Sequence, residues 1–134
     1  MTTNYKSIAK KLKFEGRAFI DGKSVDAIDG KKFENINPAT GEVLCSVAKC
    51  NSKDVDLAVK VSKKSFNSGV WSKRSPEFRK DILLKFAELL RKHGEENSVL
   101  ECVDTGKLIS DCINEVANDA PMHFQWYGEL IDKV

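Results

Sequence analysis

The chain has 134 residues, 41% of them hydrophobic and 31% charged, and a net charge of +2. This length suits a single domain, and the composition excludes a disordered protein. No apolar run approaches the ~18 residues of a membrane helix, and the basic start has no apolar block behind it, which argues against a secretory signal. We therefore expect a cytoplasmic protein.

The small net charge hides two opposite halves. Residues 60–94 hold ten Lys and Arg against three Asp and Glu, whereas residues 95–134 hold two against nine. A basic stretch with aromatic residues is one pattern of a nucleic-acid surface. These charges instead alternate with apolar helix positions, which is typical of a solvated helix face, and we expect no nucleic acid as a partner.

The first part of the chain predicts β structure after a polar, basic arm at residues 1–16. An apolar pair leads into Asp21-Gly22, which suits the positive φ angles of a type I′ hairpin turn. Asp29-Gly30 repeats the turn signal before a third extended segment. Residues 37–41 then predict a turn built on Pro38 and Gly41, and a strand of period two follows over residues 43–47.

After residue 51 the apolar period changes to that of a helix. Ser52 is the expected N-cap, and Asp54 lies in the first turn, where its charge favours the positive end of the helix dipole. Gly69 closes the helix. Five residues fall on one stripe of this helix: Val55, Ala58, Val59, Ser62 and Phe66.

Three more helices are predicted. The first begins at the N-cap Ser75, followed by a proline at the first helical position, and is expected to stop at Gly94. A short helix over residues 95–104 ends at Gly106. The last helix starts at Leu108, and Pro121 inside it is expected to kink the turn at residues 117–120, because proline lacks a backbone N–H. Its apolar stripe consists of Ile109, Ile113, Val116, Ala120, Phe124, Tyr127 and Ile131.

No catalytic group or phosphate cradle stands out. Neither Gly-x-Gly-x-x-Gly nor Gly-x-x-x-x-Gly-Lys-Ser/Thr is present, and Gly106-Lys107 is interpreted as a helix C-cap. The four cysteines show no zinc-ligand spacing, and they are interpreted as structural thiols. Only Cys50, near a helix start and beside a lysine, has surroundings that could activate a thiol. The acids Glu115 and Asp119 are interpreted as part of a solvated helix face.

The order of these features resembles the opening of the NAD(P)-dependent aldehyde dehydrogenases. Five segments are similar to family patterns: the hairpin at residues 19–22, the Asn-Pro-Ala-Thr-Gly-Glu-Val turn at 37–43, the helix from 54 with the loop after it to 71, the helix at 75–96, and Asp-Thr-Gly-Lys at 104–107. The ending from Trp126 is similar to the subgroup that oxidises gamma-glutamyl-gamma-aminobutyraldehyde. Two residues depart from the family pattern: Leu108 replaces a proline, and Pro121 interrupts a helix that is generally smooth.

The resemblance implies an α+β fold that forms part of the α/β fold of a longer parent. Residues 1–16 would be an arm, and residues 17–134 the N-terminal part of the dinucleotide-binding domain, ending before its Rossmann-like core. Ile36, through its carbonyl, and Asp104 resemble residues that hold a structural monovalent cation. Glu115 and Asp119 fall where the family's helix lines the mouth of the aldehyde channel. In the competing interpretation, Ile36 only ends a strand and Asp104 is an acid at a helix end. Glu115 and Asp119 are then solvated acids.

The parent reaction implied by the resemblance is attack of a cysteine thiolate on an aldehyde, hydride transfer to NAD or NADP, and hydrolysis of the thioester with a glutamate as base. Those residues of the family lie beyond Val134. For this chain alone we therefore expect no catalytic residue, no cofactor and no turnover, with the rest of the polypeptide as its partner and self-association in its absence. The alternative is a stand-alone α+β interaction module or a decayed gene product without activity.

Overall fold

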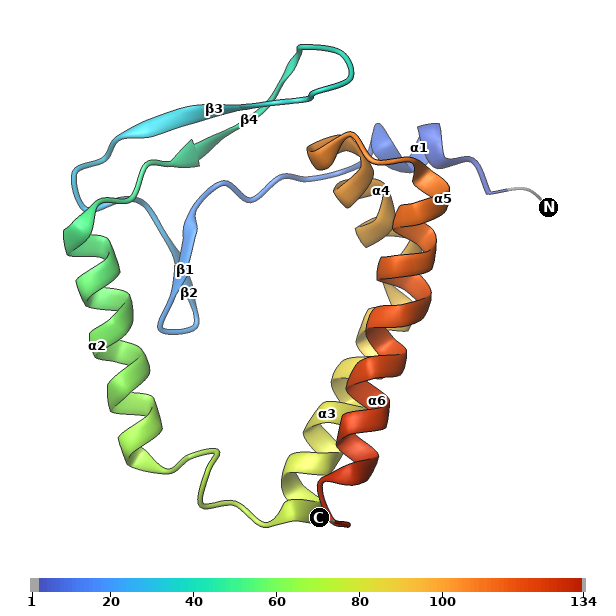
Figure 1. Ribbon diagram of the computed structural model, residues 1–134. Coiled ribbons are helices and arrows are strands. Elements are labelled where there is room, and N and C mark those ends of the chain that lie inside the picture. Colours follow the sequence, from blue (N-terminus) through green and yellow to red (C-terminus); the bar gives the residue numbers. More distant parts are fainter. Residues whose placement is uncertain (1–2, 134) are drawn as a thin grey trace. The chain divides into compact units, whose positions relative to one another are not determined.

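The computed structural model describes residues 3–133, which divide into two compact units (Figure 1). One unit is Lys13–Lys73, and the other joins Met1–Leu12 to Arg74–Val134. The first unit holds the strands and one long helix, and the second holds the other helices. No described helix is long and apolar enough to cross a membrane. The fold is therefore α+β, with small antiparallel sheets and a helical cluster in different units.

Strands β1 (Ala18–Ile20) and β2 (Lys23–Val25) form the predicted antiparallel hairpin. Both turn residues have positive φ, 55° at Asp21 and 74° at Gly22, as a type I′ turn requires. Asp21 is the single non-glycine residue with positive φ among those described. A short polar side chain tolerates this conformation better than a branched one, so Asp-Gly is well suited to the position.

Strands β3 (Lys32–Ile36) and β4 (Val43–Ala48) form a second antiparallel pair, with an irregular register at Asn35–Ile36. The predicted turn between them is confirmed. The Asn37 N–H donates to the Glu42 carbonyl (2.9 Å), the Gly41 N–H donates to the Asn37 carbonyl (2.8 Å), and Gly41 has a φ of 74°.

Helix α2 (Ser52–Ser68) is capped by Asn51, so the prediction of Ser52 as N-cap is wrong by one residue. The Asn51 side chain accepts the Lys53 N–H (2.8 Å), and the Asp54 carboxylate accepts the Asn51 N–H (2.8 Å) in return. This capping box satisfies donors that a helix start leaves open. Asp54 is only 3% exposed, and its second oxygen accepts the Ile28 N–H (2.8 Å), which ties the loop after β2 to α2.

The large apolar side chains of the stripe predicted on α2 are exposed within this chain. Val55, Val59 and Phe66 are 57%, 60% and 74% exposed. The side of α2 that packs beside the β1–β2 hairpin carries Leu57 and Val61 instead, together with the buried Asp54. The helix ends at Gly69 with a φ of 73°, as predicted.

In the other unit, helix α1 (Tyr5–Ala9) gives the expected arm a defined structure. It packs against helix α4 (Gly94–Thr105), and the Thr3 hydroxyl donates a hydrogen bond to the Glu95 carboxylate (2.9 Å). The described residues before Lys13 therefore belong to the helical unit. The domain boundary at residues 16–17 stays a prediction.

Helices α3 (Pro76–Lys92) and α6 (Ala120–Leu130) pack side by side in opposite directions (Figure 1). Ser75 caps α3 as predicted, and its hydroxyl accepts the Phe78 N–H (3.3 Å). The Phe86 and Phe124 rings meet edge to face with centroids 4.7 Å apart. Much of the apolar face of this pair is nevertheless exposed, including Ile82, Phe86, Leu89, Phe124 and Tyr127. Self-association through this face stays a prediction.

The predicted last helix is one helical run in three parts: α5 (Ile109–Cys112), the π-helix η1 (Ile113–Asp119) and α6. The Ala120 N–H bonds the Glu115 carbonyl, five residues earlier rather than four. The predicted disturbance thus takes the form of a π-helix directly before Pro121. The missing N–H of this proline and the bulk of its ring exclude the regular bond to the Ala117 carbonyl.

The prediction that Gly94 stops α3 is wrong in its reason. Helix α3 ends at Lys92, and His93 is both its C-cap and the N-cap of α4. Gly94 is the first residue of α4, and its φ is not positive. Gly94 is needed for packing instead, since a Cβ there would lie 2.8 Å from the Cβ and 3.1 Å from the Cα of Ala117. The glycine lets α4 and η1 approach closely.

Candidate functional site

Ile36 and Asp104, the two residues expected to share a monovalent cation, belong to different units. Ile36 ends β3 beside the irregular register, and its side chain is exposed. Asp104 lies in the last turn of α4, just before Gly106 ends that helix with a φ of 76°. Among residues 3–133, no group of three or more His, Cys, Asp or Glu side chains is placed to hold a metal ion. The shared cation site therefore stays a prediction.

Glu115 and Asp119, the acids expected near an aldehyde channel, both lie exposed on η1. The Glu115 carboxylate accepts a hydrogen bond from Lys107 Nζ (2.7 Å), and a Glu101 oxygen lies 3.6 Å from the same ammonium. The hydrogen bond from Lys107 to Glu115 raises the pKa of the lysine. Lys107 thus orients Glu115, whereas Asp119 stands at the solvent-exposed end of the π-helix. Their place in a substrate channel stays a prediction.

The π-helix is held on α4 by two small residues. Gly94 contacts Ala117 directly, and the fully buried Ser98 hydroxyl donates to the Gly94 carbonyl (2.7 Å) and lies 3.1 Å from the Cys112 carbonyl. Through these contacts α4 supports the segment that presents Glu115 and Asp119. Ser98 belongs to no motif, and its position four residues after a glycine on a helix is the only sequence signal for this role.

The cysteines show no arrangement for nucleophilic catalysis. All four are free thiols. Cys112 is 0% exposed, and burial raises the pKa of its thiol, which disfavours the reactive thiolate. Cys50 is exposed between β4 and α2. The Cys102 Sγ lies 3.1 Å from the Lys107 carbonyl, a contact that supports the loop before α5.

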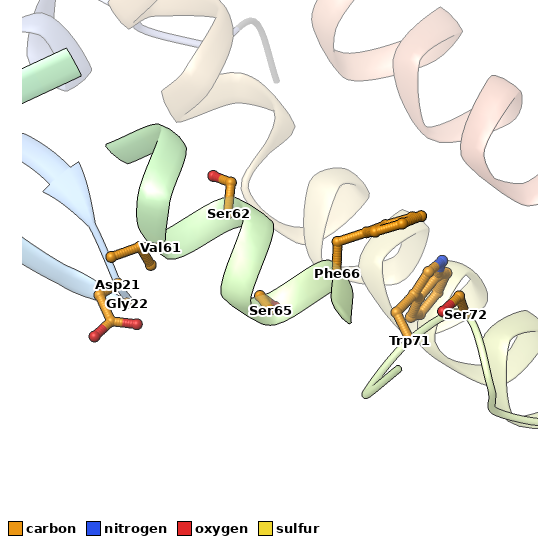
Figure 2. A pocket seen from close by; sticks show the side chains of 8 residues that line it. All are labelled: Asp21, Gly22, Val61, Ser62, Ser65, Phe66, Trp71 and Ser72. Carbon is orange, nitrogen blue, oxygen red and sulfur yellow. The ribbon is translucent and has the colours of Figure 1, made fainter. Parts of the chain in front are cut away.

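The strand-containing unit has an open hollow of about 480 Å³ beside α2. Figure 2 shows the β-hairpin turn residues Asp21 and Gly22 at one end and the aromatic side chains of Phe66 and Trp71 at the other. Val61 and serine hydroxyls line the rest. The hollow contains one carboxylate and no cysteine, histidine or lysine, so it offers no paired nucleophile and base.

Residues 25–134 match the model of the aldehyde dehydrogenase family. The chain is 43% identical to the aminoacetaldehyde dehydrogenase of Pseudomonas aeruginosa, over 97% of this chain and 26% of that protein. The chain belongs to the aldehyde dehydrogenase family. It is also 38% identical to the NADP/NAD-dependent aldehyde dehydrogenase PuuC of Escherichia coli, over 94% of this chain and 26% of that protein.

Solved structures of aldehyde dehydrogenases share this fold. The gamma-glutamyl-gamma-aminobutyraldehyde dehydrogenase of Burkholderia cenocepacia matches with a TM-score of 0.92 at 42% identity, over 97% of this chain and 26% of that one. An indole-3-acetaldehyde dehydrogenase of P. syringae, solved with NAD+, matches with a TM-score of 0.92 at 39% identity, over 97% of this chain and 26% of that one. The chain thus spans about a quarter of the length of these aldehyde dehydrogenases.

Among the described residues, the glycines do not form the usual phosphate cradle of a dinucleotide site. A phosphate cradle needs backbone N–H groups that are open to the ligand at a helix N-terminus, usually beside glycine. Gly94 opens α4, but Ala117 fills the space beside it. The glycines with positive φ lie in turns or end a helix, and they are Gly22, Gly30, Gly41, Gly69 and Gly106.

Proposed function

We propose that this chain is the N-terminal portion of an NAD(P)-dependent aldehyde dehydrogenase and that it contributes structure rather than reacting groups. The observation that carries the proposal is the family match over residues 25–134 together with a TM-score of 0.92 over about a quarter of the related enzymes. The parent oxidises an aldehyde to a carboxylic acid, with NAD or NADP as the hydride acceptor. The nucleophile, the base and the dinucleotide site come from the rest of the polypeptide.

Within that parent, η1 is assigned to the mouth of the aldehyde channel. Glu115 and Asp119 place two carboxylates on the same π-helix, and Lys107 orients the first of them. Carboxylates favour a cationic substituent on a substrate. Similar enzymes are named for aminoacetaldehyde and for gamma-glutamyl-gamma-aminobutyraldehyde, and both of these aldehydes carry nitrogen. We therefore assign the parent an aldehyde with a nitrogen-containing substituent.

A chimera tests this function. In the Pseudomonas aeruginosa enzyme, the segment that matches this chain is replaced by residues 1–134, and NAD(P)-dependent oxidation of aminoacetaldehyde is measured. We expect turnover by the chimera and none by the 134-residue chain alone. A chimera with the thermal stability of its parent but no turnover would contradict the proposal and favour a stand-alone interaction module.

A further inference from the structure

Two of the free cysteines lie where α4 packs against α5. Cys102 is in the last turn of α4 and is half-buried, whereas Cys112 is the last residue of α5 and is 0% exposed. Residues 106–108 join the two helices, so both thiols belong to one tight helical hairpin. Neither thiol takes part in the proposed function, and the inference drawn from them does not depend on it.

The contacts of this hairpin place both cysteines on the surfaces that meet. The Ser98 hydroxyl lies 3.1 Å from the Cys112 carbonyl, and one turn later on the same face of α4 the Cys102 Sγ lies 3.1 Å from the Lys107 carbonyl. The two helices therefore run in opposite directions. Because the Cα–Cβ bonds of a helix tilt towards its own N-terminus, Cys102 leans towards the level of Cys112, and Cys112 leans towards the level of Cys102.

The spacing of the helices and the charges around Cys112 agree with this placement. A Cβ at Gly94 would lie 2.8 Å from the Cβ of Ala117, so α4 and the run that starts with α5 are in close contact. Burial raises the pKa of Cys112, and a thiolate at Cys102 raises it further, ahead of the nearby acid Glu101. The effect of one charge on another falls with distance, so Cys102 is a near neighbour of Cys112.

We propose that Cys102 and Cys112 form an oxidation site at which a hydroperoxide links α4 to α5 through a disulfide. The Cys102 sulfur attacks one oxygen of hydrogen peroxide, the O–O bond breaks, and the other oxygen leaves as water with the thiol proton. The Cys112 sulfur then attacks the Cys102 sulfenic acid, the S–O bond breaks, and the hydroxyl leaves as water with the Cys112 proton. Two thiols are oxidised, and one peroxide is reduced to two molecules of water.

Exposure assigns the order of these two steps. A small peroxide reaches the half-buried Cys102, whereas the 0% exposed Cys112 is shielded from it. Cys112 reacts second because its thiol is held beside the sulfenic acid, which makes the step intramolecular. The disulfide ties α4 to the residue directly before η1. Oxidation thus fixes the segment that carries Glu115.

Peroxide treatment of the full 134-residue chain tests this site. Remaining thiols are blocked with N-ethylmaleimide, the chain is digested with trypsin without reduction, and the peptides are identified by mass spectrometry. Lys107 lies between the two cysteines, so only a disulfide keeps their tryptic peptides together. Cys45 and the exposed Cys50 are the internal controls, because both belong to the other unit.

At low protein concentration, we expect the pair of residues 102 and 112 to be at least about tenfold more abundant than any other pair. In Cys112→Ala, Cys102 should remain a sulfenic acid that dimedone traps, and in Cys45→Ala the pair should form as in the wild type. Peroxide that converts Cys102 to a sulfinic acid without this pair, or leaves Cys102 reduced while Cys50 is oxidised, would overturn the proposal. A pair that forms only between two copies at high concentration would overturn it as well. The wild-type chain decides these outcomes even where a variant loses its helices by circular dichroism.

Discussion

Replacing Asp54 by alanine should destabilise the unit formed by residues 13–73 more than any exposed substitution on α2. The carboxylate is 3% exposed and accepts two backbone N–H groups, from Ile28 and from Asn51, each at 2.8 Å. A hydrogen bond to a charged group contributes about 1.5–3 kcal/mol, and loss of a cap costs about 0.5–2 kcal/mol. Because the two bonds share one side chain, their effects are not additive, and we expect a loss of about 2–4 kcal/mol.

The assay is urea unfolding followed by circular dichroism, with amide hydrogen exchange at Ile28 and Asn51 as a local readout. Asp56→Ala is the matched control, because Asp56 is an exposed acid on the same helix, and it should change stability by no more than about 0.5 kcal/mol. Asp54→Asn keeps one acceptor oxygen and should fall between the two. Equal stability of Asp54→Ala and Asp56→Ala, with unchanged protection of the Ile28 amide, would refute the role assigned to this carboxylate.

Three further predictions concern the helical unit and the thiols. Gly94→Ala should lower the free energy of unfolding by about 1–3 kcal/mol, because the added methyl group meets η1; an unchanged melting temperature would contradict that contact. The hydrogen bond from Lys80, followed by the one from Lys133, lowers the pKa of Asp132 to about 2, below an unfolded value of ~3.9. The stabilisation is therefore present above about pH 4 and lost as the pH falls towards 2, and an NMR titration should show a higher Asp132 pKa in Lys80→Met. Iodoacetamide should modify the exposed Cys50 at least about tenfold faster than the buried Cys112 in the folded chain, and equally fast in guanidinium.

Local sequence rules predict most of the elements of this fold. Asp21-Gly22 forms a hairpin turn, Ser75 caps α3 and Gly69 ends α2. Each depends only on the backbone next to it, so residue type is enough to predict it. Residue type alone does not predict the N-cap of α2, because Asn51 and Ser52 are both good capping residues. The choice depends on the reciprocal bond from the Asn51 N–H to the carboxylate three residues later.

Contacts between distant segments could not be predicted in this way. Gly94 stands after a run of basic residues, where a helix stop is expected, and only the fold reveals that Ala117 fills the space beside it. Periodicity correctly groups Val55 with Val59 and Phe66, but it does not reveal whether their partner is part of the chain. The candidate site shows the same limit, since Glu115 and Asp119 come from the family resemblance, and the bond from Lys107 to Glu115 appears only in three dimensions.

Turnover measured in parallel on the 134-residue chain and on the chimera tests the central claim most directly. Both proteins receive aminoacetaldehyde with NAD or NADP, and the reduced nicotinamide is followed by its absorbance. The account predicts steady formation of reduced nicotinamide by the chimera and none by the chain alone. Steady turnover by the chain alone, with contamination by a longer enzyme excluded by mass spectrometry, would contradict it.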